Sequence, residues 1–282
     1  NFDQKDGNFK LGREGGHTEN RIVHHKDITG AEIERALLAY IDKSENIKIL
    51  DYHYVVDLIT QHHIPGKTWD KNNITCYGAY VLDQKNKKIE KITAKVTMVA
   101  TGGAGHVYKN TTNPIIATGD GIAFVHRARG KVSNMQYIQF HPTAMYSKRD
   151  GMLFLISEAV RGDGAKLRTK NGEKFMHKYD EREELASRDI VARAIDNEMK
   201  ITGDEFVGLD CTHMNREKFI EHFPNIYQKC LDEGIDPMKQ LIPVVPASHY
   251  LCGGIDIDMN AQSSIKNLFA VGECTNSGLH GA

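Results

Sequence analysis

Leu268-Phe-Ala-Val-Gly-Glu-Cys-Thr-Asn-Ser-Gly-Leu-His-Gly-Ala282 is the stretch that decides the fold of this chain. Its apolar residues 268–271 predict a buried strand, which leads directly into Gly272-Glu273. A strand that ends in a glycine turn and a carboxylate lets the backbone come close to a bound ligand. The chain stops within this glycine-rich motif and starts with Asn1, so we expect it to be a piece of a longer protein.

A second apolar stretch, residues 96–101, also runs into glycines, at Gly102, Gly103 and Gly105. It predicts close approach of the backbone to a planar or phosphorylated ligand, although a plain turn would show the same pattern. No GxGxxG lies between a first strand and a helix, so the unit that grips pyrophosphate is missing from this sequence. Glu273 could accept hydrogen bonds from ribose or ribityl hydroxyls, or could be a solvated turn residue.

The rest of the pattern predicts an α/β domain interrupted by a second, mixed domain. Residues 1–29 are interpreted as loop, and the segments from about Asn134 onward are irregular and polar. Because an inserted domain of this kind places a substrate cleft between domains, the polar segments are candidates for a binding site. The predicted helices are 30–43, 118–129 with Gly130 as C-cap, 187–200 with Ser187 as N-cap, 216–223 and 226–232; the predicted strands are 47–54, 55–60, 74–82, 89–94, 206–209 and 243–251.

Composition argues against several classes of function. The 282 residues carry 36 basic and 37 acidic side chains, which does not favour a nucleic-acid or membrane-surface partner. No run of 18 apolar residues predicts a membrane span. The cysteines are odd in number, scattered and without a CxxC pair, so we predict a reduced, cytoplasmic protein with no disulfide framework and no metal site.

Two pairs of adjacent histidines, His24-His25 and His62-His63, could suggest metal ligands. Neighbouring residues of a helix or strand point to different sides, however. We therefore predict ordinary surface histidines at all four positions.

Several polar residues are candidates for chemistry. His141 precedes a proline, which favours an extended backbone there, and taken alone it could equally be a structural histidine. Glu158 and Arg161 are three residues apart and could simply form an ion pair on a helix surface. Arg188 opens a predicted helix, where the dipole disfavours a cation. Its fork of donors suits a carboxylate partner, although a surface arginine in a loop would show the same pattern. His249 lies near the point where the chain returns to the first domain.

These stretches occur together, and in this order, in a known family. The chain resembles the succinate dehydrogenase and fumarate reductase flavoproteins, and within them the L-aspartate oxidases, over nearly its whole length. The matching stretches are Leu11-Gly-Arg-Glu-Gly-Gly-His17, Arg21-Ile-Val-His24, Asp27-Ile-Thr-Gly30, Ala100-Thr-Gly-Gly103, Thr111-Thr-Asn-Pro114, Gly119-Asp-Gly121, Phe140-His-Pro-Thr143, Glu158-Ala-Val-Arg-Gly162, Ser187-Arg-Asp-Ile-Val-Ala-Arg193, His249-Tyr250 with Gly253-Gly254, and Gly272-Glu273 with Gly278-Leu-His-Gly-Ala282.

The resemblance implies an incomplete FAD-binding, Rossmann-like domain at residues 1–134 and 252–282, with an inserted α+β capping domain at 135–251. The family also has a GxGxxG unit before this region and a substrate-binding arginine after it, so we expect the isolated chain to be inactive. The residues implied at the dicarboxylate site are His141, Ser157, Glu158, Arg188 and His249, of which Arg188, His249 and His141 are the catalytic ones; those implied on the flavin side are Glu14, Gly15, Gly16, His17, Gly102, Gly103 and Glu273.

The implied reaction is FAD-dependent oxidation of L-aspartate to iminoaspartate, with O2 or fumarate as acceptor, leading to quinolinate and NAD. Quinolinate synthase is then a pathway partner. A fumarate reductase or succinate dehydrogenase flavoprotein subunit remains an alternative, because both branches bind four-carbon diacids and share the site residues. In the reductase branch the residue matching Arg188 transfers a proton, whereas in the oxidase it holds substrate.

Overall fold

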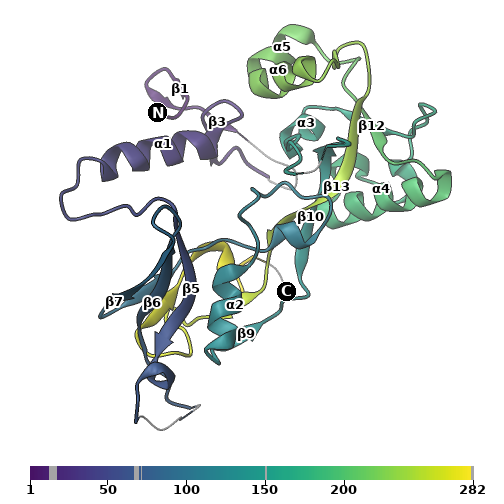
Figure 1. Cartoon of the computed structure of the whole chain (residues 1–282). Helices are drawn as coiled ribbons and strands as arrows, with labels where there is room; N and C mark the ends of the chain where they lie inside the picture. The colour runs from purple at the N-terminus through teal and green to yellow at the C-terminus, as the bar shows by residue number, and fades with distance from the viewer. Residues whose placement is uncertain (13–17, 67–69, 71, 150, 281–282) are drawn as a thin grey trace. The chain divides into compact units, whose positions relative to one another are not determined.

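The computed structural model describes residues 1–12, 18–66, 70, 72–149 and 151–280. The chain divides into two compact units (Figure 1), Asn1–Lys48 with Phe140–Ala247 and Ile49–Gln139 with Ser248–Ala282. It passes between them after Lys48 and again inside two strands, β10 (Ile138–Met145) and β13 (Ile242–Leu251). The assignment of residues 135–251 as a capping domain stays a prediction, because a division by contacts does not identify what either unit binds.

The first unit is built on a four-stranded sheet in the order β10-β13-β12-β11, completed by β11 (Lys166–Arg168) and β12 (Val207–Asp210). Its core includes Phe175, Ile195 and Leu209, all fully buried. The prediction of irregular structure from Asn134 onward was wrong here. Residues 141–145 of β10 are all buried, so this strand shows no alternation of apolar and polar residues.

Helices of the first unit follow the predicted pattern closely. Within one or two residues, helical periodicity located α1 (Thr29–Ile41), α4 (Arg188–Thr202), α5 (Arg216–His222) and α6 (Pro224–Asp232), and α5 packs beside α6 (Figure 1). Ser187 is the N-cap of α4 as predicted, but its hydroxyl donates to Asp189 rather than capping the backbone. The unit also contains α3 (Glu158–Gly162) and the short strands β1 (Gln4–Lys5), β2 (Asn8–Phe9), β3 (Leu11–Gly12) and β4 (Ile22–Val23), which lie in the segment predicted as loop.

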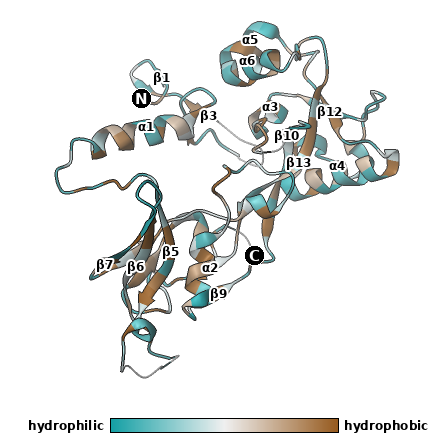
Figure 2. Ribbon diagram, in the orientation of Figure 1, coloured by the Kyte–Doolittle hydropathy of each residue, from teal (hydrophilic) through white to brown (hydrophobic). Residues whose placement is uncertain are grey.

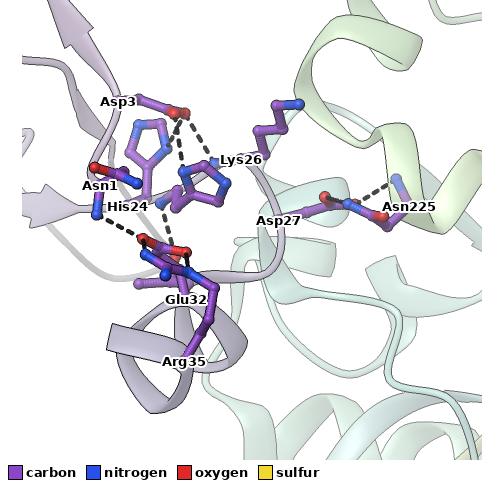
Figure 3. A network of polar contacts seen from close by, with 10 residues as sticks. Asn1, Asp3, His24, Lys26, Asp27, Glu32, Arg35 and Asn225 are labelled. Atoms are coloured by element: carbon purple, nitrogen blue, oxygen red, sulfur yellow. Dashed lines mark hydrogen bonds and ion pairs between the residues drawn. The ribbon is translucent and has the colours of Figure 1, made fainter. Parts of the chain in front are cut away.

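The N-terminal segment is tied to the rest of the first unit through Asp27 (Figure 3). One carboxylate oxygen accepts hydrogen bonds from the backbone N–H groups of Asn225 and Ile226, both at 3.0 Å, and the other accepts from the Asn225 side chain at 2.6 Å. Those backbone groups lie in the first turn of α6, where the N–H groups have no partner within the helix. Asp27 therefore supplies a cap to α6 from far along the chain.

His24 and His25 do not point apart as predicted. Their Nδ1 atoms lie 3.2 and 3.6 Å from the two carboxylate oxygens of Asp3, which also accepts the Lys26 N–H (Figure 3). The two histidines follow β4 and belong to neither a strand nor a helix, so the alternation of a strand does not apply to them. His62 and His63 are exposed, as predicted, and both lie beside the Thr60 hydroxyl.

The second unit contains the predicted antiparallel meander, β5 (His53–Thr60), β6 (Cys76–Asp83) and β7 (Lys88–Thr93). Beside it lie the parallel pair β8 (Thr97–Val99) and β15 (Leu268–Ala270), and helix α2 (Asp120–Arg127), whose hydrophobic residues share a core with the strands (Figure 2). The remaining strands of this unit are β9 (Val132–Ser133), β14 (Gly254–Asp256) and β16 (Thr275–Asn276). Its 3-10 turns are Gln61–His63, Gly105–Val107 and Gly272–Cys274. The first unit has 3-10 turns at Met176–Lys178 and Glu183–Leu185.

Two local predictions in the second unit were wrong. A strand was expected over 47–54, but only its last two residues belong to a strand, because residues 47–50 make no sheet pairing and 51–52 form a turn. The left-handed residue that ends α2 is Arg129, with φ of 67°, rather than Gly130. Gly130 is needed for a different reason: a Cβ there would collide with the side chain of Val125.

Among the described residues, no group of three His, Cys, Asp or Glu side chains is arranged to hold a metal ion. No helix in the described segments combines the length and apolar character required to cross a membrane. None of the five cysteines, all within the described residues, forms a disulfide, and burial raises the pKa of the Cys230 thiol to about 12.

Candidate functional site

The strongest polar feature of the first unit joins Arg188 to Glu158. The Nε of Arg188 donates to Oε2 of Glu158 at 2.5 Å, and the Glu158 side chain is almost completely buried. Each residue is the first of its helix, α4 for Arg188 and α3 for Glu158. The carboxylate is therefore at the favourable end of a helix dipole, and it also offsets the unfavourable placing of the arginine.

Arg161 lies on the other side of Glu158 and is only 1% exposed. Its Nη2 is 3.8 Å from Oε1 of Glu158, and its Nη1 donates to the Glu184 carbonyl at 2.5 Å. Burial lowers the pKa of the Arg161 guanidinium, against the opposing effect of the Glu158 carboxylate. The ion pair suggested by the spacing exists, but it is buried, so the simple helix-surface interpretation was wrong.

Further support for Arg161 comes from Glu184, which sequence reasoning missed. The Glu184 carboxylate accepts hydrogen bonds from the Leu167 N–H at 3.0 Å and from the Lys166 ammonium at 2.8 Å. This fixes the segment whose carbonyl receives the Arg161 donor. Nothing local in the sequence marks Glu184 for this role, since its partners lie in a different strand and helix.

The ring of His141 is held in one protonation form by its own strand. The Thr143 N–H donates to Nδ1 of His141 at 3.2 Å. A backbone N–H can only donate, so Nδ1 must be the accepting nitrogen and the ring proton is on Nε2. His141 is buried, with its ring N–H at Nε2.

Hydrogen bonds between Thr143 and Ile156 connect β10, the strand that carries His141, to the start of α3. The Thr143 hydroxyl donates to the Ile156 carbonyl at 2.9 Å, and the Ile156 N–H donates to the Thr143 carbonyl at 3.0 Å. Ile156 directly precedes Ser157, whose hydroxyl accepts the Ala159 N–H as the N-cap of α3. The first unit thus gathers four of the predicted dicarboxylate residues: His141, Ser157, Glu158 and Arg188.

The second unit holds His249, near the end of β13. Its Nδ1 lies 2.8 Å from the hydroxyl of Thr112, and its carbonyl accepts the Asn113 side-chain N–H at 3.0 Å. The Thr111-Thr-Asn-Pro114 stretch was noted only as part of a family pattern, and its contact with His249 was not predicted. No local signal could have found this contact, because 137 residues separate Thr112 from His249.

The two glycine turns also lie in the second unit, at the carboxyl ends of the parallel strands β8 and β15. Gly102 and Gly272 have φ of 73° and 74°, and a Cβ at either would meet no atom within 4 Å. The backbone is therefore open at both turns, and a ligand could approach it closely.

Glu273 joins these turns to the strand that carries His249. Its carboxylate accepts the Leu251 N–H at 2.9 Å and is also hydrogen bonded by the backbone of Gly103. Burial raises the pKa of Glu273, and these two backbone hydrogen bonds oppose that rise. The Glu273 carboxylate thus holds two backbone N–H groups of the protein, independently of any hydrogen bond that it accepts from a ligand hydroxyl.

We expect Gly103→Ala to disrupt this junction. A Cβ at Gly103 would collide with the Glu273 carboxylate, which must then leave its two N–H donors. Leaving buried groups unpaired costs about 1–3 kcal/mol. Urea unfolding followed by circular dichroism should show this loss, whereas Gly102→Ala, at an open site, should show only the smaller strain of a positive φ. Equal stability of Gly103→Ala and the unmodified protein would contradict the assignment.

Four predicted flavin-side residues, Glu14, Gly15, Gly16 and His17, lie outside the described residues. The others fall into two sets, one in each unit. The set of the first unit can bind carboxylate and ammonium groups, and the set of the second offers an imidazole and two open glycine turns. An arginine, a carboxylate and imidazole N–H donors are the groups that recognise a small molecule with acidic and amino functions.

A family model described as "FAD binding domain" matches residues 1–282, and the chain belongs to this family of FAD-binding proteins. The open backbone at Gly102 and Gly272 fits the approach of such a cofactor. Among curated proteins, the chain is 48% identical over 286 residues to a chloroplastic L-aspartate oxidase of Oryza sativa subsp. japonica, covering 99% of this chain and 43% of that protein. It is 47% identical to L-aspartate oxidase of Pseudomonas aeruginosa, covering 97% of this chain and 50% of that protein.

The solved structures show the same fold. A quinol-fumarate reductase superposes with a TM-score of 0.86 at 31% identity, covering 99% of this chain and 49% of that one. The Sdh1 complex of Mycobacterium smegmatis superposes with a TM-score of 0.74 at 34% identity, covering 99% of this chain and 48% of that one. The chain thus spans about half the length of the relatives it matches, and the prediction of an α/β FAD-binding fold of this flavoprotein family is confirmed.

Proposed function

We propose that the protein of which this chain is part oxidises L-aspartate to iminoaspartate with FAD, using O2 or fumarate as acceptor, in the synthesis of quinolinate and NAD. The observation that carries the proposal is the 45–49% identity of the chain to L-aspartate oxidases, and the Arg188–Glu158 pair supplies groups that fit the substrate. The pair places a cation for a carboxylate beside an anion for an ammonium group. L-aspartate carries both groups. The reductase branch shares these residues, so the preference for L-aspartate over succinate rests on the sequence identity to L-aspartate oxidases.

In this proposal each residue has a distinct task. Arg188 binds one substrate carboxylate through its planar fork, and His141 donates its Nε2–H to a carboxylate oxygen. Glu158 binds the substrate ammonium, and His249 binds the second carboxylate. Holding both ends of the substrate fixes its Cα in the reactive position, which removes much of the entropic cost of the reaction.

FAD supplies the redox chemistry by accepting a hydride from the substrate. Before the hydride leaves, the substrate amine must be neutral, so a nearby carboxylate or water takes a proton. We do not assign this step to Glu158, because its carboxylate is already engaged by Arg188 and Arg161 and, in this proposal, binds the substrate ammonium.

Other parts of the proposal remain predictions. We propose that residues 135–251 form a capping domain over the substrate, that Glu14–His17 contact the flavin side, and that Glu273 accepts a hydrogen bond from the cofactor. Quinolinate synthase as a pathway partner and a cytoplasmic location are also kept as predictions.

A second candidate is a fumarate reductase or succinate dehydrogenase flavoprotein, which the TM-score of 0.86 with quinol-fumarate reductase favours. The full-length protein with bound FAD distinguishes the two. We expect peroxide release with L-aspartate and little reduction of a dye with succinate. Reduction of the dye with succinate, without peroxide release from L-aspartate, would reverse the choice. D-aspartate serves as the control. It has the same two carboxylates and the same amine as L-aspartate, but its opposite configuration prevents these three groups from binding at their sites while the Cα–H points at the flavin.

A further inference from the structure

The hydroxyl of Thr112 lies 2.8 Å from Nδ1 of His249. We propose that Thr112 is a positioning residue that fixes the tautomer and the orientation of the His249 ring, so that Nε2 carries the proton and faces a substrate carboxylate. This inference rests on the proposed function in one respect, that His249 binds a substrate carboxylate. The position of the ring proton on Nε2 is argued separately, from hydrogen bonds within the second unit.

The hydrogen bonds to the Ser248 carbonyl determine which acceptor receives the hydrogen of the Thr112 hydroxyl. This carbonyl accepts the Thr112 N–H at 3.0 Å and the Thr111 hydroxyl at 3.0 Å, and the Thr112 hydroxyl is farther away, at 3.4 Å. A carbonyl oxygen has two lone pairs, and the two shorter bonds use both. The single hydrogen of the Thr112 hydroxyl therefore goes to Nδ1 of His249, which must be unprotonated.

The backbone around His249 is held without the Thr112 side chain. Besides the bonds to the Ser248 carbonyl, the Ser248 N–H donates to Asn110 at 2.9 Å, and the Asn113 side chain holds the His249 carbonyl. The Glu273 carboxylate holds Leu251 two residues further on. Removing the Thr112 hydroxyl should therefore take this hydrogen bond from the imidazole ring while leaving the strand in place.

A fixed tautomer has a direct consequence for binding. With the proton on Nε2, the neutral ring can donate a hydrogen bond to a carboxylate oxygen, which is the role proposed above for His141. With the proton on Nδ1, Nε2 presents a lone pair and repels the same oxygen. Thr112 thus makes His249 a donor without requiring it to carry a charge.

The first test observes the ring directly, in full-length flavoprotein labelled with 15N-histidine. Two-bond proton–nitrogen correlation spectra show which ring nitrogen is protonated, and His249→Gln identifies the His249 signal. We expect a protonated Nε2 and an unprotonated Nδ1 in the unmodified protein and in Thr112→Ser. In Thr112→Val, which keeps the side-chain shape, we expect a mixture of tautomers. A protonated Nδ1 in the unmodified protein, or a Thr112→Val spectrum identical to it, would overturn the proposal.

The second test is kinetic. We expect Thr112→Val to raise the KM for L-aspartate by about five- to tenfold, with a smaller change in kcat, and Thr112→Ser to restore it, because one hydrogen bond is lost and regained. Thr93→Val, the same change on exposed strand β7, should have no effect. If His249→Gln leaves KM unchanged, the role of His249 in the proposed function fails, while the spectra still decide the role of Thr112. If His249→Gln raises KM but Thr112→Val does not, the positioning role fails.

Discussion

Replacing Arg188 with glutamine is expected to lower kcat/KM for L-aspartate by about 10²- to 10³-fold. The change removes a charged fork from a nearly buried carboxylate, and losing one partner of such a pair costs about 2–5 kcal/mol. In the proposed site Arg188 binds the substrate and also holds Glu158, so both carboxylate and ammonium recognition should suffer. Steady-state peroxide release by the full-length flavoprotein measures the effect.

Two further variants show whether the fork or the charge of Arg188 is needed. Arg188→Lys keeps the charge but loses the planar pair of donors, so we expect an intermediate loss. Arg193→Gln is the matched control, since this arginine is on the same helix, 74% exposed and paired with Asp189. Arg193→Gln should change kcat/KM by less than about twofold. Full activity in Arg188→Gln, or an equal loss in Arg193→Gln, would contradict the site.

Replacing Arg161 with alanine is expected to have the largest effect on stability, lowering the free energy of unfolding by about 3–5 kcal/mol. The guanidinium is 1% exposed, and its removal takes one cation from the buried Glu158 carboxylate and leaves a cavity. It also leaves the Glu184 carbonyl without its donor. Urea unfolding, followed by circular dichroism, should show a lower midpoint.

Arg161→Met separates volume from charge. Methionine fills most of the space, and Glu158 keeps its bond to Arg188, so we expect less than half of the loss seen for alanine. Part of the guanidinium is already poorly satisfied, because Nε and Nη2 have no hydrogen-bond partner among the described residues. The control is Arg182→Ala, an exposed residue paired with Asp180, which should cost about 0.5 kcal/mol or less. Equal losses for the alanine and methionine variants would show that the charge, and not the volume, is what Arg161 contributes.

Local sequence determined much of this protein. The period of 3.6 residues located α1, α4, α5 and α6, and the apolar stretches that run into glycines located β8 and β15. The position of Arg188 at a helix start was also visible, because the helix dipole makes a cation unusual there. These features depend on residues within a few positions of one another, so their physical causes can be read directly from the sequence.

Only the tertiary structure decided which of these residues meet. It joined Arg188 to Glu158 across 30 residues and Thr112 to His249 across 137, and it buried Arg161, which its spacing alone would place on a helix surface. It also formed β10 from a segment with no alternating pattern. Side-chain burial and hydrogen-bond partners depend on packing between segments that are distant in the sequence. The periodicity of one segment does not indicate which other segment it will pack against.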